Sequence, residues 1–203
     1  LERDKVLSGR QKDAIRQYVR MHTDKPEELY QIYHAMIRGE NYKAETLEVL
    51  MEEGQPVIKI AGNEIRAAFE QLKDFVQKLI LLTERTLPLG SVVEVDIREL
   101  KLETEKPVSS IKVVIVDRFM KKETEKQYVP YCGIIYPFGD SKKQLFFTEQ
   151  AIHTVIHYGY TDRQEDAYVA LIKREIIKKG YSSYSFAEAE DDKIRMLQSD
   201  INL

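Results

Sequence analysis

Two histidines, His153 and His157, are the first residues to test for metal chemistry, because imidazole is a common zinc ligand. They stand four residues apart in a segment that alternates polar and apolar side chains, which predicts a β-strand. On a strand, four residues span roughly 13 Å, which is too far for both rings to bind one ion. The neighbouring sequence offers no third ligand, so we predict two histidines on a half-exposed strand and no metal site.

Cys132 is the one cysteine of the chain, so no intrachain disulfide can form, which fits a reducing compartment. It lies in an apolar segment between Tyr131 and Gly133, and no cationic motif nearby would lower the pKa of its thiol. A buried, unreactive cysteine is therefore predicted. Since the chain also lacks GxSxG, phosphate-loop and HExxH patterns, we predict no catalytic residue and no cofactor.

Tyrosine is the residue type most suggestive of function, with 12 copies and no tryptophan. A tyrosine ring joins an apolar face to a polar hydroxyl, and such side chains are common at protein-binding surfaces. The simpler interpretation is that these rings pack in the core with their hydroxyls at its rim. We hypothesise instead that a subset of aromatic residues forms a partner-binding face. The candidates are Tyr131, Tyr136, Phe138, Phe119, Tyr158 and Tyr160.

The composition argues against two classes of partner. Lysine and arginine number 31 against 34 acidic residues, giving a net charge of -3, so the chain lacks the basic surface that nucleic acids require. No apolar run approaches the ~20 residues of a membrane helix, so no membrane insertion is predicted. No signal peptide opens the chain as given, which predicts a cytoplasmic protein, although the first residue, Leu1, leaves an upstream signal open.

The elements that would position these residues fall into two regions, and the first of them, residues 1–86, is predicted to be helical. Ser8 and Gln11 have the spacing of a capping box, and Gly39 is typical of a helix end. The segment Pro56–Ile60 favours either a strand or an extended linker. The four predicted helices cover residues 8–21, 26–39, 42–53 and 63–83.

The helix expected over residues 63–83 carries apolar residues at alternating spacings of four and three, which is the pattern of a heptad seam. The seam consists of Ile65, Phe69, Leu72, Val76 and Leu79. Two interpretations remain open. The seam packs against the three earlier helices, as amphipathic helices usually do, or it docks a helix from another protein.

The second region, residues 87–180, is predicted to be rich in β-structure. Pro88 ends the preceding helix and Gly90 turns the chain into a strand that alternates from Ser91 to Ile97. Several short strands follow, and Thr161 is the expected cap of a closing helix over residues 162–179. The fold class is therefore α+β, with a helical region, then a small, bent antiparallel sheet or partial barrel closed by a C-terminal helix. Residues 181–203 form a tail with a short helix expected near 187–197.

Four segments of the second region carry a family resemblance. They are Leu87–Val93 (LPLGSVV), Val113–Arg118, Tyr128–Gly139, and Phe146–Tyr160 with the acidic Glu165 and Asp166 after it. In this order and spacing they resemble a family of small, uncharacterised proteins of Gram-positive bacteria, which usually has a glycine where Asp117 stands. The genes of that family lie in type VII secretion loci, near LXG-type toxins and WXG100-like helical proteins. The resemblance covers residues 87–179 and leaves residues 1–86 outside it.

The resemblance implies a non-enzymatic, cytoplasmic accessory protein that binds an LXG-type toxin or its small helical partners, as a chaperone or a targeting adaptor. Homo-oligomers remain possible. One alternative is an immunity protein that neutralises the toxin domain, although the balanced charge of this chain differs from the strongly acidic inhibitors of nucleases. A second alternative is an enzyme with an unrecognised site, which would need a pocket gathering Asp117, Arg118 and the two histidines.

Overall fold

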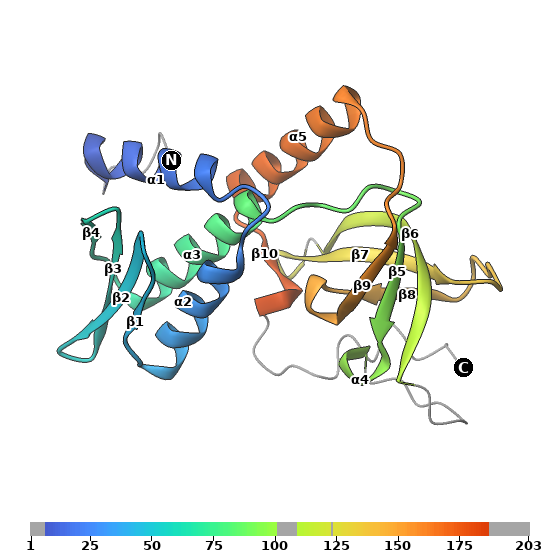
Figure 1. The fold of residues 1–203 in the computed structure, drawn as a ribbon, viewed down its shortest axis with the longest axis horizontal. Helices are drawn as coiled ribbons and strands as arrows, with labels where there is room; N and C mark the ends of the chain where they lie inside the picture. Colours follow the sequence, from blue (N-terminus) through green and yellow to red (C-terminus); the bar gives the residue numbers. More distant parts are fainter. Residues whose placement is uncertain (1–6, 101–108, 123, 187–203) are drawn as a thin grey trace. The chain divides into compact units, whose positions relative to one another are not determined.

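The computed structural model describes residues 7–100, 109–122 and 124–186, and the chain divides between Arg85 and Thr86 into two units (Figure 1). Each unit has its own sheet and its own helices, and all strand pairs but one are antiparallel. The predicted α+β class with a C-terminal helix is confirmed. No helix within the described ranges is both long and apolar enough to cross a bilayer.

The first helix begins, and the second helix ends, at the capping residues that the sequence predicts. In α1 (Gly9–Met21), the Gln11 amide donates to Ser8 Oγ at 3.3 Å, and the Ser8 amide donates to the Gln11 side chain at 2.7 Å. This is the capping box expected from the sequence. The second helix, α2 (Glu27–Arg38), ends at Gly39, whose φ of 67° is the left-handed conformation that glycine adopts at little cost.

The predicted third helix over residues 42–53 is wrong, because this segment forms two strands of a four-stranded sheet. The strands, in sheet order, are β1 (Tyr42–Lys43), β2 (Leu47–Glu52), β3 (Gln55–Ile60) and β4 (Asn63–Ile65). Glu53 and Gly54 form a two-residue turn with φ of 50° and 79°, which is the hairpin geometry that matches strand twist. Leu47 and Val49 then point to the same buried side, as alternate residues of a strand must.

The predicted helix over residues 63–83 begins later than expected, because residues 63–65 belong to β4. The observed helix is α3 (Phe69–Thr83), and Gln71 caps it by accepting the Ala68 amide at 3.3 Å. Ile65 of the predicted seam therefore lies on a strand, paired with Ile58. Of the remaining seam, Leu72, Val76 and Leu79 are buried and Phe69 is half-buried.

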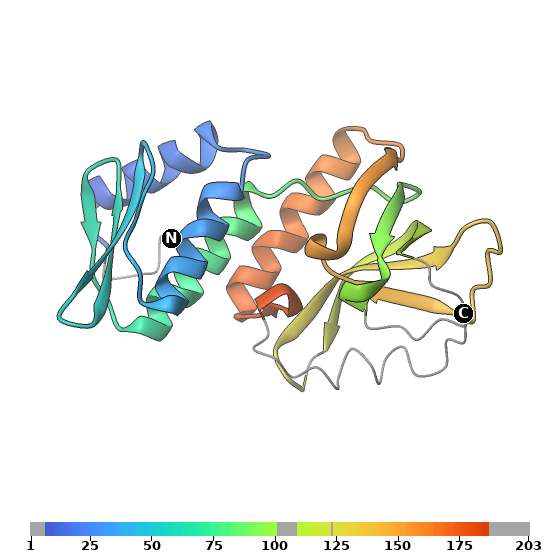
Figure 2. The ribbon, with the colours of Figure 1, turned by 60° about the horizontal axis from the view of Figure 1, so that its bottom comes forward.

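The core of the first unit lies between its helices and one face of its sheet (Figure 2). Residues that alternate along β2 and β3 bring their side chains to this face, while Glu48 and Lys59 lie opposite each other on the other face. The seam of α3 packs here, against α1, α2 and β3. Docking an external helix on the seam would therefore require this packing to open.

The second unit contains a six-stranded, bent sheet. Five strands follow the order β10-β7-β6-β5-β9, and β8 pairs with β7 beside β10. The strands are β5 (Val92–Asp96), β6 (Ser110–Lys122), β7 (Gln127–Ile135), β8 (Gln144–Phe147), β9 (Ile152–His157) and β10 (Ser182–Ser183). Register shifts in β6 and β9 bend these strands, as bulges do.

Short helical segments complete the second unit. They are α4 (Ile97–Leu100), the 3₁₀ turns η1 (Glu149–Ala151) and η2 (Tyr184–Phe186), and the closing helix α5 (Arg163–Lys179). The cap of α5 is Asp162 and not Thr161 as predicted, because Asp162 Oδ1 accepts the amides of Gln164 and Glu165 at 2.9 Å each. The helix expected near residues 187–197 lies outside the described residues.

Candidate functional site

The stretch Leu87–Val93, where the family resemblance begins, is held in place by buried hydrogen bonds. The Leu87 amide donates to the Tyr131 hydroxyl at 3.1 Å, and the Leu87 carbonyl accepts from Arg118 at 3.2 Å. Both polar groups of one backbone unit are therefore satisfied by side chains from β7 and β6. This arrangement positions the entry of the chain into the sheet.

Ser91 and Gly159 join this entry to the segment between β9 and α5. The Ser91 hydroxyl is buried, donates to the Pro88 carbonyl at 2.8 Å and accepts from the Gly159 amide at 3.0 Å. A Cβ atom at Gly159 would lie 2.0 Å from the Leu89 carbonyl oxygen, so only glycine fits this close approach. The residues that carry the resemblance here build the fold and leave no free nucleophile.

Arg118 ties α5 to the sheet. Its side chain is only 3 % exposed and binds the Glu165 carboxylate through both terminal nitrogens, one of them at 3.1 Å. The guanidinium also lies 5.9 Å from the ring centre of Tyr168. A second ion pair joins Lys121 to Glu175 at 2.7 Å, and with Lys179 it lowers the pKa of Glu175 to about 2. Arg118 therefore orients a helix, which is a structural role.

Cys132 is buried in β7, as its sequence context predicts. Burial raises the pKa of its thiol to about 11, and the neighbouring Asp117 carboxylate adds to the effect. Because the thiolate is the nucleophilic form, this cysteine is unreactive near neutral pH.

His153 and His157 lie exposed on β9, at the outer edge of the described sheet. In residues 7–100, 109–122 and 124–186, no three histidine, cysteine or acidic side chains stand close enough to hold a metal ion. The enzyme alternative would need a pocket lined by Asp117, Arg118 and the two histidines, and these residues have different surroundings. Arg118 is committed to Glu165, and the histidines face outward.

A polar cluster that sequence reasoning missed joins η1 to η2. The Ser185 hydroxyl donates to Glu149 at 3.0 Å and lies 2.9 Å from the Ser183 hydroxyl, while Gln150 donates to the Ser185 carbonyl at 3.5 Å. Burial raises the pKa of Glu149, and nearby Lys173 opposes that shift. The cluster connects the segments next to β9 and β10 and so draws the two ends of the sheet together. No local spacing in the sequence signals it.

The structure divides the six predicted aromatic residues into a buried pair and an exposed set. Tyr131 and Phe119 are only 2 % and 7 % exposed. The Tyr131 ring stacks on Phe147 with centres 5.7 Å apart, and Phe119 packs against Tyr128. These two residues belong to the core, so their assignment to a partner-binding face does not fit the structure.

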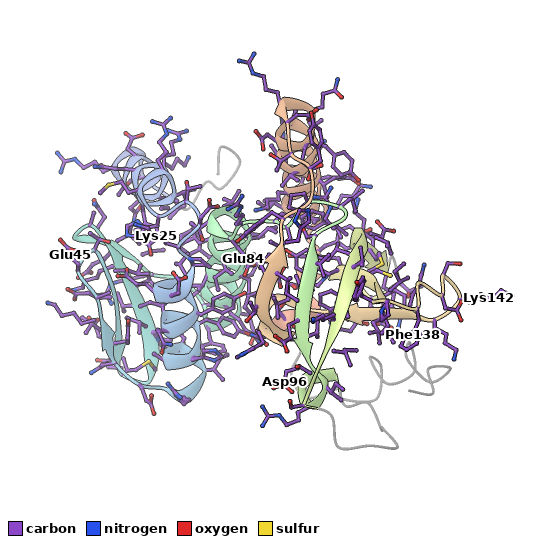
Figure 3. All side chains as sticks on the ribbon, turned by 45° about the vertical axis from the view of Figure 1, so that its right-hand side comes forward. Lys25, Glu45, Glu84, Asp96, Phe138 and Lys142 are labelled. Carbon is purple, nitrogen blue, oxygen red and sulfur yellow. The ribbon has the colours of Figure 1, made fainter. Side chains whose placement is uncertain are left out.

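Four of the predicted residues are exposed, and they form two groups. Tyr136 and Phe138 lie on the loop between β7 and β8, where Phe138 is 81 % exposed (Figure 3). Tyr158 and Tyr160 flank Gly159 on the segment between β9 and α5, where Tyr160 is 82 % exposed. The contact between Gly159 and Leu89 brings a third exposed apolar residue to this second group.

These features define a small α+β domain with a buried structural polar network and exposed aromatic residues. Residues 86–168 match the family described as a domain of unknown function, DUF4176. The match includes the Leu87–Val93 stretch, β5 to β9 and the first turns of α5, and it excludes the first unit. No curated protein and no solved structure matches the chain.

Proposed function

We propose that this chain is a non-enzymatic protein-binding accessory of type VII secretion. It acts in the cytoplasm and holds an LXG-type toxin, or the small helical partners of that toxin, as a chaperone or targeting adaptor. The secretion context comes from the family resemblance of residues 87–179. The binding role is supported by the surface of the same residues.

The observation that carries the proposal is the exposure of aromatic side chains in the second unit. Phe138 and Tyr160 leave more than four-fifths of their surface in water, although aromatic residues gain most from burial. Tyr136 with Phe138, and Tyr158 with Tyr160, are two pairs of exposed aromatic residues close in the sequence, and clustered exposed apolar residues are typical of interaction sites. Tyrosine and phenylalanine also contribute strongly to binding once a partner covers them.

Binding is further supported by what the ionisable residues contact. Arg118 pairs with Glu165, Lys121 pairs with Glu175, and Cys132 is buried as a neutral thiol. Each of these groups stabilises the fold, and none is poised for proton transfer or nucleophilic attack.

The experiment is capture of partners from the native host with the tagged full chain, followed by mass spectrometry. Recovery of an LXG-type toxin, lost when Tyr160 is replaced by alanine, would support the proposal. Truncating the toxin then separates two roles: binding to its export domain indicates a chaperone, and binding to its toxic domain indicates an immunity protein. Recovery of no secretion substrate would overturn the export role.

A further inference from the structure

The loop between β7 and β8 combines an exposed aromatic group with unpaired positive charge. We infer that this loop, residues 136–143, docks on an acidic protein surface and inserts Phe138 into an apolar pocket there. The inference rests on the proposed binding function and adds the location and the chemistry of the contact.

Backbone hydrogen bonds give the loop a defined shape. The Tyr136 amide donates to the Lys112 carbonyl at 2.9 Å, and the Gly139 amide donates to the Ile135 carbonyl at 3.0 Å. Asp140 closes the turn, because its side chain accepts the Lys142 amide at 2.9 Å and its carbonyl accepts the Lys143 amide at 3.1 Å. A loop held in this way loses little conformational entropy when it binds.

Three lysines near Phe138 carry positive charge that could pair with a partner. Lys142 and Lys143 belong to the loop, and Lys112 lies beside Tyr136 on the neighbouring strand. All three are exposed, and none of them forms an ion pair with another described residue.

Asp140 and Glu94 stand near these lysines, and in the described residues neither carboxylate forms an ion pair with them. Asp140 caps its own turn, and Glu94, which lies opposite Lys112, accepts a hydrogen bond from Ser110. Other lysines of the second unit, such as Lys121 and Lys122, pair with glutamates. With Asp140 counted, residues 136–143 still carry a net charge of +1, and Lys112 lies beside them, on a chain whose net charge is -3.

Charge complementarity decides which occupant fits. A positive patch around one aromatic side chain suits a negative surface that surrounds an apolar pocket, because such a pair attracts at long range and seals Phe138 from water. An anionic membrane fits less well, since the net charge of the chain is negative and one loop offers a single strongly exposed apolar ring. A second copy of the chain would bind only if its own acidic residues surrounded a pocket.

The test measures binding of the full chain to the purified LXG domain of a toxin from the same host. Phe138→Ala should weaken binding at least tenfold, and Lys142→Glu with Lys143→Glu should weaken it about tenfold and flatten its salt dependence. Two matched controls should bind as the native chain does. Met21→Ala removes an exposed apolar side chain from the first unit, and Lys25→Glu with Lys178→Glu makes the same change in net charge away from the loop.

The outcomes separate the inference from the proposed function. If the native chain binds the LXG domain and the loop variants bind equally well, the loop inference is wrong and the function stands. If the native chain binds neither the LXG domain nor the small helical partners of the toxin, the proposed function fails. In that case the native chain and the loop variants are compared in their capture of host proteins. The loop inference is overturned if the variants capture the same proteins as the native chain, or if the native chain captures none.

Two further measurements address the other occupants. If the native chain cosediments with phosphatidylglycerol vesicles and the loop variants do not, the loop binds a membrane and not an acidic protein. If light scattering shows that the native chain is a dimer and that Phe138→Ala is a monomer, the loop binds a second copy of the chain. Either result overturns the inference of an acidic protein partner.

Discussion

The two units differ in how completely they cover their apolar residues. In the described part of the first unit, Met21 and Ile37 are the exposed large apolar side chains, and the aromatic residues Tyr18 and Tyr33 are buried. Of the eleven large apolar side chains that are exposed among the described residues, the other nine belong to the second unit. Because exposed apolar surface costs free energy in water, its concentration in one unit supports the proposal that a partner binds there.

The ion pairs of the two units also differ. Arg66 in the first unit pairs with Glu52 and Glu64 at the surface, with about half of its side chain in water. Arg118 in the second unit pairs with Glu165 almost without exposure. The second unit therefore combines a buried ion pair with exposed aromatic side chains.

The largest effect is expected at the close contact of Gly159. Gly159→Val should lower the free energy of unfolding of the second unit by about 4 kcal/mol, since its Cβ would overlap the Leu89 backbone. Hydrogen exchange measured segment by segment gives the stability of each unit separately. Gly9→Ala, which meets no atom within 4 Å, is the control and should change little. Equal loss of protection in both units would contradict the separation.

Breaking the buried ion pair should come next. Arg118→Met leaves Glu165 without its partner and should cost about 3 kcal/mol, whereas replacing both residues by apolar ones should recover most of that loss. Arg66→Met in the first unit should cost less than about 1 kcal/mol, because its ion pairs are exposed. Urea denaturation of the native chain and these three variants measures the differences. A similar cost for Arg66 and Arg118 would remove the contrast between the units.

The buried thiol predicts a stability loss at high pH. The pKa of Cys132 is raised from 9.0 to about 11, so between these values the unfolded chain releases a proton that the folded chain retains. Stability should therefore be unaffected below pH 9 and fall by on the order of 2 kcal/mol as the pH rises toward 11. Cys132→Ala should remove this part of the pH dependence. Rapid reaction of the native thiol with a disulfide reagent at pH 8 would contradict its burial.

The smallest effect on stability is expected at the exposed aromatic residues. Phe138→Ala and Tyr160→Ala should change the free energy of unfolding by less than about 0.5 kcal/mol, because neither side chain is covered in the free protein. Thermal unfolding measures this change. A large loss of stability would mean that these rings pack against the fold and that their exposure does not indicate a binding surface.

Local signals allowed some of the helix ends to be predicted. Ser8 with Gln11 begins α1 and Gly39 ends α2, since a cap depends on residues within one turn of the helix. The strand β5 was equally predictable, because Val93 and Val95 alternate with Glu94 and Asp96 on either side.

The sheet of the first unit was misread because its apolar pattern fits two structures. Leu47, Leu50 and Met51 share one face of a helix, yet Leu47 and Val49 also share one face of a strand. The pair Glu53 and Gly54 is a hairpin turn, but a glycine at that place also resembles a helix end. Pairing with β3 decides between these structures, and pairing is not local.

The candidate surface was predictable in kind but not in detail. Tyrosine content led to the prediction of a recognition surface, which stays a prediction, and four of its six aromatic residues are exposed. Tyr131 and Phe119 are buried because β7 and β6 turn them toward Phe147 and Tyr128, which only the three-dimensional pairing determines. The charge of the β7–β8 loop emerges in the same way, since Lys112 joins it from another strand.

The most direct test of a binding surface in the second unit is hydrogen–deuterium exchange of the full chain, free and bound to a captured LXG-type toxin. We predict that binding protects residues 136–143 and 157–161 and leaves residues 9–85 unchanged, because Tyr136, Phe138, Tyr158 and Tyr160 are exposed in the former segments. Protection confined to residues 9–85 would contradict this account and would move the binding surface to the first unit.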